Sequence, residues 1–482
     1  MAIFDPKSLR AEEFINDEEI REIIAYAEAN KHNIELINSL LEKAAPKRSG
    51  NGVTCAGLTH REASVLLACD IPEVTERMYK LANDIKLAFY GNRIVMFAPL
   101  YLSNYCVNGC VYCPYHLKNK HIARIKLTQE QVRQEVIALQ DMGHKRLAIE
   151  AGEDPVHNPI EYILECIKTI YSVHHKNGDI RRVNVNIAAT TVENYRKLKD
   201  AGIGTYILFQ ETYNKKSYLE LHPTGPKHDY DYHTEAMDRA MEGGIDDVGL
   251  GVLFGLEGYQ YEFAGLLMHA EHLEAVHGVG PHTISVPRIK HADDIDPNVF
   301  DNSLSDELFA KIIACIRIAV PYTGMIISTR ESETIRGKVL DYGISQISGA
   351  SRTSVGGYTE KERPHDSEQF DVSDQRTLDE VVRWLMELDH IPSFCTACYR
   401  EGRTGDRFMS LCKNGQILNC CHPNALMTLT EFLVDYASDE TRNIGYEMIS
   451  REIEKIPNEK VRELTRQHVA DIRSSNRRDF RF

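Results

Sequence analysis

Three cysteines stand close together in the segment NYCVNGCVYCPYH, where Cys106, Cys110 and Cys113 have the spacing C-x3-C-x2-C. A 4Fe-4S cluster has four irons, and full ligation by the protein takes four cysteines. Three cysteines leave one iron with an open coordination position, and such a position lets a cofactor or substrate bind the metal. Gly109 gives the loop the backbone freedom to fold three sulfurs around one cluster. The segment therefore predicts a catalytic iron-sulfur cluster.

The same cysteines suit a second kind of site. A structural zinc ion takes four ligands, and His116 or His121 would complete the set. Tyr112, directly before the last cysteine, would supply an aromatic face beside a cluster.

A second group of cysteines lies in FCTACYREGRTGDRFMSLCKNGQILNCCHPNAL, at positions 395, 398, 412, 420 and 421. A C-x2-C pair followed by further cysteines is ordinarily a zinc pattern. Counted from Cys395 and Cys398, a C-x2-C-x22-C pattern ends on Cys421 and again leaves three ligands for four irons. Cys420 is a rival for the third position.

Composition limits the class of protein. A chain of 482 residues with 43% hydrophobic content buries a large core, and its formal net charge of -15 opposes binding to phosphate backbones and anionic lipid. We therefore expect neither a nucleic-acid nor a membrane partner. No run of eighteen uncharged apolar residues and no signal-peptide pattern occurs, so we expect a cytoplasmic protein. The twelve cysteines are clustered, which favours metal binding over a disulfide framework.

The pattern of elements predicts an α/β protein. Residues 8–91 have helical periodicity, with a capping-box pattern at Thr59 and Glu62. Eight short apolar runs then alternate with helical segments, which indicates parallel strands and a (β/α)8 TIM-type barrel. The runs are RIVMFAPLYL, RLAIEAGE, RVNVNIAA, TYILFQET, DVGLGVLFG, HTISVPRI, GMIISTR and GISQISGA. We expect a helical N-terminal extension at 1–92, the barrel at 93–375 and a C-terminal iron-sulfur module at 376–482, with the polar segment 358–374 as a linker.

Functional side chains of such barrels gather at the carboxyl ends of the strands. The first run leads into the first cysteine group, and the others end in polar residues: Gly152, Glu153 and Asp154 after the second, Glu211 after the fourth, Arg330 after the seventh. We expect these residues to surround the catalytic cluster.

The first cysteine group, with an aromatic residue before its last cysteine and a strand before it, resembles the signature of the radical S-adenosylmethionine (SAM) superfamily. The resemblance implies that SAM binds the open iron through its amino and carboxylate groups. An acidic-glycine motif after the second strand holds the SAM amino group in that superfamily, and Gly152-Glu153 stands at this place. The candidate cofactor-binding residues are Tyr112, Gly152, Glu153, Asp154 and Glu211.

Longer segments resemble one family, the tyrosine lyases of FeFe-hydrogenase maturation (the HydG family). They include YCPYHLKNKHIAR, IEAGEDP, PYTGMIISTRE and FCTACYREGRTGDRFMS. The resemblance implies that an electron cleaves SAM to a 5'-deoxyadenosyl radical, that this radical takes a hydrogen atom from the amino group of L-tyrosine, and that the Cα–Cβ bond breaks to give p-cresol and dehydroglycine. It also implies onward formation of carbon monoxide and cyanide at an auxiliary cluster that carries an extra iron. A ferredoxin or flavodoxin as electron donor and other hydrogenase maturation proteins would be the partners.

Two further roles need residues. A substrate carboxylate favours a guanidinium fork, for which Arg330 is the first choice and Arg288 the second, with a structural salt bridge as the alternative for each. An extra iron favours imidazole. His282 begins the sixth run and so points to the end of the barrel opposite the first cluster, where a C-terminal module would place its cysteines. His269 and His272 are weaker candidates.

Alternatives from other classes stay open. A thiamine-type tyrosine lyase (2-iminoacetate synthase) would stop at dehydroglycine and has no need of a second cluster. A non-catalytic iron-sulfur scaffold would bind clusters without cleaving SAM. A C-terminal module held by zinc on a radical SAM barrel is the third. Hydrolase, kinase and dehydrogenase motifs are absent from the sequence.

Overall fold

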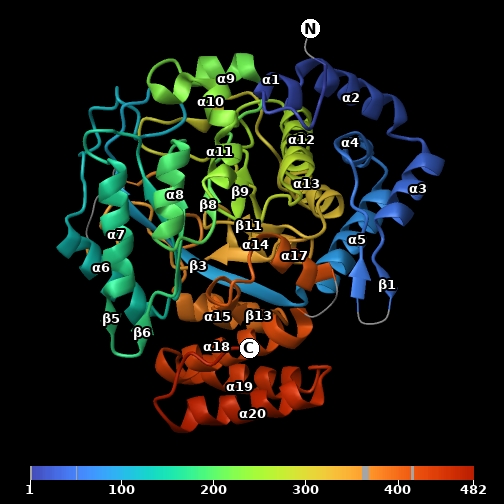
Figure 1. The fold of residues 1–482 in the computed structure, drawn as a ribbon. Helices are drawn as coiled ribbons and strands as arrows, with labels where there is room; N and C mark the ends of the chain where they lie inside the picture. Colours follow the sequence, from blue (N-terminus) through green and yellow to red (C-terminus); the bar gives the residue numbers. More distant parts are fainter. Residues whose placement is uncertain (1–2, 50–51, 361–367, 414–416) are drawn as a thin grey trace.

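A closed barrel of eight parallel strands forms the centre of the molecule (Figure 1). The computed structural model describes residues 3–49, 52–360, 368–413 and 417–482. Pairing of the last barrel strand with the first closes the sheet, with Gln346 opposite Val95. All eight predicted strands are confirmed: β3 (Arg93–Ser103), β4 (Arg146–Ala151), β7 (Arg182–Asn186), β8 (Tyr206–Ile207), β9 (Val248–Gly251), β10 (Thr283–Ser285), β11 (Gly324–Ile327) and β12 (Gln346–Ser348).

Helices follow the strands and cover the outside of the barrel (Figure 1). Their starts are set by side chains that accept hydrogen bonds from the first turn, as in the capping boxes of Thr128 with Gln131 and of Thr377 with Glu380. The helices of the outer ring are α6 (Gln129–Met142), α7 (Ile160–Ser172), α8 (Val192–Asp200), α11 (Ala236–Glu242), α12 (Tyr259–His277), α13 (Asp306–Ala319), α14 (Glu333–Leu340) and α15 (Leu378–Glu387). Two short helices, α9 (Lys215–Leu221) and α10 (Tyr230–Thr234), interrupt the long connection from β8 to β9.

The N-terminal extension is helical, as predicted, and lies against one flank of the barrel (Figure 1). It comprises α1 (Ala11–Phe14), α2 (Asp17–Asn30), α3 (Ile34–Ala44), α4 (His60–Ala68) and α5 (Pro72–Tyr90). Helices α4 and α5 pack on α12 and α13, which buries their apolar faces. The predicted capping box of Thr59 and Glu62 is confirmed at the start of α4. The short strands β1 (Lys47–Ser49) and β2 (Gly52–Thr54) interrupt the helical run and were not predicted.

The C-terminal segment attaches at the amino-terminal ends of the barrel strands. Strand β13 (Ile391–Ser393) pairs in parallel with the first three residues of β3, Arg93 to Val95, whereas β4 pairs with β3 only from Ala98 onward. The long first strand therefore carries two neighbours on successive parts of its length. After β13 come α16 (Ala397–Arg400), α17 (Gly405–Lys413), α18 (Ile417–Asp435), α19 (Asp439–Ile453) and α20 (Glu459–Ser474), and α18 to α20 lie below the barrel in Figure 1.

The predicted linker at 358–374 differs from expectation in its described part. Residues 361–367 lie outside the described residues. Before them, the backbone N–H groups of Tyr358 and Thr359 donate to the carboxylate of Glu135 on α6. After them, Gln369 accepts a hydrogen bond from the hydroxyl of Tyr101 at 2.8 Å. The segment therefore packs on the barrel instead of leading away from it.

Candidate active site

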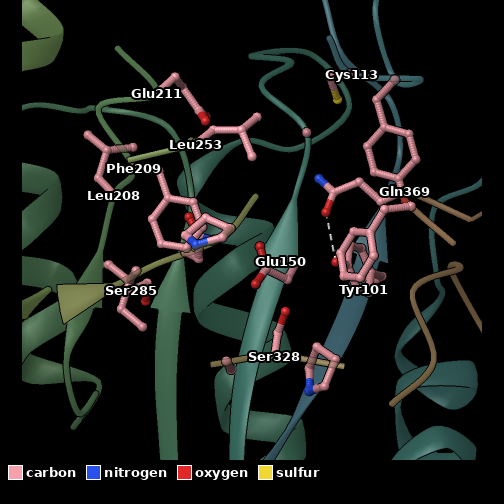
Figure 2. A pocket seen from close by; sticks show the side chains of 18 of the residues that line it. Tyr101, Cys113, Glu150, Leu208, Phe209, Glu211, Leu253, Ser285, Ser328 and Gln369 are labelled. Atoms are coloured by element: carbon pink, nitrogen blue, oxygen red, sulfur yellow. Dashed lines mark hydrogen bonds between the residues drawn. The ribbon is translucent and has the colours of Figure 1, made fainter. Parts of the chain in front are cut away.

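A cavity of about 240 Å³ opens at the carboxyl ends of the barrel strands. Cys106, Cys110 and Cys113 all line it, together with side chains from the ends of the surrounding strands (Figure 2). The cysteines lie on the loop that follows β3, because the strand delivers the chain to this end of the barrel. The structure thus brings the first cysteine group and most of the strand-end residues into one space.

The cysteine loop is held by close packing. A Cβ atom on Gly152 would lie 2.3 Å from the carbonyl oxygen of Tyr105 and 3.0 Å from Cβ of Cys106, so only glycine fits at this strand end. A Cβ atom on Gly109 would lie 2.3 Å from Oγ1 of Thr224. Gly109 is therefore required for space, and its φ angle is not among the positive values that need glycine.

Arg124 closes the loop from the other side. Its guanidinium donates to the carbonyl oxygens of Asn104 and Tyr115 at 2.7 Å each and to that of His116 at 2.7 Å. With a further bond to the carbonyl oxygen of Asn119 at 3.3 Å, a single cation thus fixes four backbone oxygens around the cysteines. Sequence reasoning missed this residue, because an arginine eleven residues after the last cysteine carries no motif.

Burial raises the pKa of all three thiols, to about 12 for Cys110. The negative charge of neighbouring thiolates adds to this effect, and the ammonium of Lys227 opposes it. Three buried thiolates therefore need positive charge, and the irons of a cluster supply it. Among the described residues, no group of three or more His, Cys, Asp or Glu side chains surrounds a point where one metal ion would sit.

The histidines of the zinc alternative are placed elsewhere. His116 lies 3.2 Å from the carboxylate of Asp294, and His121 is exposed. Neither lines the cavity.

The residues after β4 divide into two roles. Glu153 lines the cavity, and its Oε2 accepts a hydrogen bond from the amide of Asn108 at 2.6 Å. Burial raises the pKa of Glu153. Asp154 does not line the cavity: its carboxylate accepts from the backbone N–H groups of Val156 and His157 at 2.9 Å each and so closes the turn. Of the two carboxylates that follow β4, Glu153 is therefore the one that lines the cavity.

Glu211 meets a cation that the sequence did not reveal. Lys227 Nζ lies 2.8 Å from Glu211 Oε1, and both side chains line the cavity. Glu211 and the thiols hold the pKa of Lys227 above its usual value in spite of burial. Glu211 has φ of 68°, a left-handed conformation that non-glycine residues seldom adopt outside functional sites. Tyr112 lies at the same mouth, with its hydroxyl 2.6 Å from Nε2 of His222.

The two candidate arginines have different surroundings. Arg330 lines the cavity and stacks on the ring of Phe370 at 3.7 Å, and no described residue accepts a hydrogen bond from its guanidinium. The guanidinium of Arg288 is already bonded to other residues of the protein. It pairs with both carboxylate oxygens of Glu331, lies 2.8 Å from Asp306 and donates to the carbonyl oxygen of Leu304. Arg288 does not line the cavity. Of the two candidate arginines, Arg330 is therefore the one whose side chain lines the cavity.

A second cavity, of about 70 Å³, lies at the amino-terminal ends of the barrel strands. Cys395, Cys398 and Cys421 line it, and Cys420 does not. Sγ of Cys398 lies 3.9 Å from Sγ of Cys421. Hydrogen bonds from the neighbouring thiols of Cys398 and Cys420, with the Arg93 guanidinium close by, hold the pKa of Cys421 below its usual value. The three cysteines of the C-x2-C-x22-C pattern therefore share this cavity.

His282 lines the second cavity as well. Its Nε2 lies 3.1 Å from the hydroxyl of Tyr399, and its Nδ1 lies 3.3 Å from the carboxylate of Asp247. Burial lowers the pKa of His282, so the ring is neutral and able to act as a metal ligand. The weaker candidates point away: His269 bonds the hydroxyl of Tyr213, and His272 bonds Asp238, both outside the barrel.

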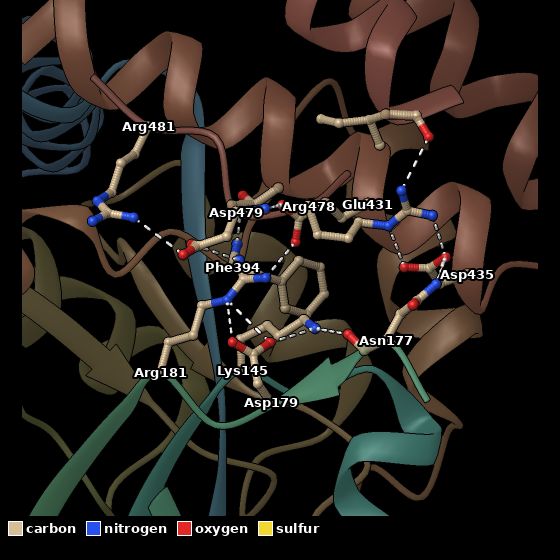
Figure 3. A network of polar contacts seen from close by, with 12 residues as sticks. Lys145, Asn177, Asp179, Arg181, Phe394, Glu431, Asp435, Arg478, Asp479 and Arg481 are labelled. Atoms are coloured by element: carbon tan, nitrogen blue, oxygen red, sulfur yellow. Dashed lines mark hydrogen bonds and ion pairs between the residues drawn. The ribbon is translucent and has the colours of Figure 1, made fainter. Parts of the chain in front are cut away.

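Charged residues fasten the C-terminal segment to this end of the barrel (Figure 3). Arg181, just before β7, lies 2.8 Å from Glu431 on α18 and 2.9 Å from Asp179. Asp479, near the end of the chain, lies 3.4 Å from Arg181 and also pairs with Arg400 beside Cys398. The cysteine loop, the last residues and the barrel are thus joined through one ionic network.

Comparisons with known proteins agree with these observations. Residues 100–268 match the model of the radical SAM superfamily, and residues 285–391 match the biotin and thiamin synthesis associated domain. A crystal structure of HydG, a maturase of the [FeFe]-hydrogenase, is 54% identical, with a TM-score of 0.91 over 97% of this chain and 100% of that one. This chain belongs to the HydG family.

Two further proteins are similar to this HydG-family chain at lower sequence identity. HydG from Carboxydothermus hydrogenoformans is 37% identical, with a TM-score of 0.81 over 95% of this chain and 99% of that one. The 2-iminoacetate synthase of Salmonella typhimurium is 27% identical over 335 residues, which are 69% of this chain and 86% of that protein. Membership of the radical SAM superfamily implies a 4Fe-4S cluster and SAM. Among the described residues, no helix is long and apolar enough to cross a membrane.

Proposed function

We propose that this HydG-family protein is a radical SAM lyase that cleaves the Cα–Cβ bond of L-tyrosine to p-cresol and dehydroglycine, and that carbon monoxide and cyanide form at its C-terminal site for an iron-carbonyl-cyanide precursor of the FeFe-hydrogenase H-cluster. One observation carries the proposal: a cavity lined by three cysteines lies at each end of a single barrel. A second three-cysteine site is what distinguishes this reaction from one that stops at dehydroglycine.

The cavity at the carboxyl ends of the barrel strands, called the upper site or upper cavity below, would hold a 4Fe-4S cluster on Cys106, Cys110 and Cys113. The bound cluster supplies the electron that cleaves SAM. Gly152 and Glu153 receive the SAM amino group in this proposal, which is supported by the position of Glu153 in the cavity lining and by the packing of Gly152 against the cysteine loop.

Two residues of the chain have proposed tasks toward tyrosine and SAM. Arg330 presents a guanidinium for the tyrosine carboxylate, since no described residue occupies it. Glu211 accepts from the SAM ribose and is held in place by Lys227. The barrel wall excludes water from the cavity between them, which protects a reactive radical.

The second cavity, at the amino-terminal ends of the barrel strands, is called the lower site below. It would hold an auxiliary iron-sulfur cluster on Cys395, Cys398 and Cys421, with His282 as the ligand of an extra iron. That cluster supplies the metal that captures small products. Cys421 is favoured over Cys420 because it shares the cavity with the other two cysteines. An electron donor such as a ferredoxin or flavodoxin and the other hydrogenase maturation proteins would be the partners, by analogy with the family.

A thiamine-type tyrosine lyase is the second candidate. The similarity to 2-iminoacetate synthases over more than half of the chain favours it. The buried three-cysteine cavity under the barrel weighs against it, because that reaction does not use a second cluster.

The test is an anaerobic assay of the iron-reconstituted protein with SAM, L-tyrosine and dithionite, in which p-cresol, cyanide and carbon monoxide are measured. The intact protein should make all three. A Cys395→Ala/Cys398→Ala variant should keep p-cresol and lose carbon monoxide. Formation of p-cresol alone by the intact protein would support the thiamine-type reaction, and absence of SAM cleavage under every condition would support a cluster scaffold.

A further inference from the structure

Two side chains of opposite charge line the upper cavity without a charged partner. Glu150 and Arg330 both face this space, and neither forms an ion pair with any residue in the described part of the chain. The other charged groups of the cavity are held by neighbours: Glu211 by Lys227, Lys290 beside Glu331, and Glu153 by the amide of Asn108. Glu150 is thus a carboxyl group in the cavity to which the proposed function assigns no role.

Glu150 sits near the carboxyl end of β4. Its backbone pairs with Tyr101 on β3 and with Asn186 on β7, and the amide of Asn186 hydrogen-bonds its side chain. Figure 2 shows its carboxyl group in the middle of the cavity, below Cys113 and between Phe209 and Tyr101. The first cysteine group and Glu150 therefore line the same cavity at different positions.

Isolated charges inside a protein are costly, and a ligand that neutralises them gains the energy of that pairing. Arg330 and Glu150 influence each other electrostatically but stay apart, so a ligand with both a carboxylate and an ammonium group satisfies the two together. We propose that Glu150 binds the α-ammonium group of the substrate amino acid opposite Arg330 and removes one proton from it before the hydrogen atom is taken. This inference rests on the proposed function.

The proton transfer is balanced: the substrate R–NH3⁺ and the Glu150 carboxylate become R–NH2 and the Glu150 carboxylic acid. Loss of a hydrogen atom from a neutral amine leaves a neutral nitrogen radical. Loss from an ammonium group would instead leave a nitrogen radical cation, which lacks the lone pair that stabilises the neutral radical. A base at this position therefore makes the abstraction easier.

The surroundings of Glu150 suit such a base. Burial raises the pKa of Glu150 to about 8, Glu211 adds to the rise, and the Asn186 hydrogen bond and the Arg330 charge oppose it. Tyr101 and Tyr115 also interact with it electrostatically, but their hydroxyls donate to Gln369 and to the carbonyl oxygen of Thr353, and burial keeps both neutral because it raises their pKa. A carboxyl group whose pKa is near neutrality exchanges a proton with an amine at little cost.

The test compares reconstituted enzyme with SAM and its Glu150→Gln variant, by equilibrium binding of three ligands. The ligands are L-tyrosine, 3-(4-hydroxyphenyl)propanoate, which lacks the amino group, and L-phenylalanine, which lacks the hydroxyl. We expect Glu150→Gln to weaken the binding of L-tyrosine by about tenfold or more, since a charged hydrogen bond is lost. Binding of the propanoate should stay close to that of the intact enzyme, so that the preference for the amino group disappears.

Several outcomes would overturn the inference. If Glu150→Gln keeps the preference for the amino group, Glu150 does not bind it. If the variant instead loses its preference for tyrosine over phenylalanine, Glu150 binds the phenol. Glu161→Gln, which removes an exposed carboxylate on α7, is the charge-matched control and should behave as the intact protein.

A kinetic readout separates this inference from the proposed function. The acid limb of kcat/KM should rise with pH toward the pKa of about 8 in the intact enzyme, because the ionised form of Glu150 is the base, and should flatten in Glu150→Gln. SAM cleavage without tyrosine should be equal in the intact enzyme and in the Glu161→Gln control. If the intact enzyme neither binds nor cleaves tyrosine, the proposed function fails; if it does both and the variant matches it, only the role of Glu150 fails.

Discussion

Replacement of Arg330 tests the substrate site most directly. The guanidinium of Arg330 faces the cavity, and Phe370 supports it by stacking at 3.7 Å. A guanidinium fork makes two charge-assisted hydrogen bonds to a carboxylate. At about 1.5–3 kcal/mol for each such bond, Arg330→Gln should cost about 3–6 kcal/mol of tyrosine binding. Because about 1.4 kcal/mol is a factor of ten, KM for tyrosine should rise by about 10² or more.

The size of the effect should depend on shape as well as charge. Arg330→Lys keeps a cation but loses the planar fork, so its KM should fall between those of the intact protein and Arg330→Gln. The assay is p-cresol formation against tyrosine concentration, with SAM cleavage in the absence of tyrosine as a second readout. The second readout should not change, because Arg330 is assigned to the substrate and not to SAM.

Arg288→Gln is the matched comparison. Its guanidinium is occupied by Glu331, whose side chain is only 1% exposed. Loss of one partner of a buried pair typically costs about 3–5 kcal/mol, so Arg288→Gln should lower the melting temperature. KM for tyrosine should change little in the protein that still folds. An unchanged KM in Arg330→Gln beside a raised KM in folded Arg288→Gln would refute the assignment.

Three further predictions concern the cluster sites and the acid stability. Gly152→Ala should lower the iron content of the first site, because the added Cβ would lie 2.3 Å from the Tyr105 carbonyl oxygen. Iron analysis of Gly152→Ala in a variant that lacks the C-terminal cysteines checks this. Full iron content would contradict it. In a background without the first three cysteines, Cys421→Ser should remove iron from the C-terminal site and Cys420→Ser should not; equal loss in both would show that the cavity does not select the ligand. Hydrogen bonds from two histidines lower the pKa of Asp238 although burial opposes them, so its stabilising effect is complete above the unfolded pKa near 3.8 and is lost as pH falls below it. Asp238→Asn should therefore lower the melting temperature at pH 6 more than at pH 3.

Much of the barrel could be predicted from the sequence, because parallel strands buried on both faces produce short apolar runs between amphipathic helices. The strands that were missed lack such a pattern. Residues 47–49, 52–54 and 391–393 are three-residue segments, and the last contains a proline. Pairing with the first three residues of β3 makes a strand of 391–393, and that partner is distant in the sequence.

The candidate site was predictable where a motif is local and not where partners meet across the fold. The cysteine spacings and the strand-end position of Glu153 and Arg330 are local signals. Lys227 reaches Glu211 from another loop, and Arg124 contacts backbone oxygens, so neither leaves a pattern. Glu150 did leave one: it is a polar residue two positions after Ala148 and four after Arg146 on a strand whose alternate side chains face the barrel interior.

The contacts of the last residues bear on the order in which the molecule is built. Arg400, Glu401 and Arg403 follow Cys398, and they bind Asp479, Arg481 and the carbonyl oxygen of Phe482 respectively. A ribosome has therefore completed the barrel and the first cysteine loop long before the loop after Cys398 gains these contacts. The contacts described for the first cysteine loop come from Arg124, Gly152 and Thr224, whereas the loop after Cys398 gains its contacts only once residues 479–482 have been made. The two cysteine loops therefore reach their final contacts at different times, which are set by the positions of their partners along the chain.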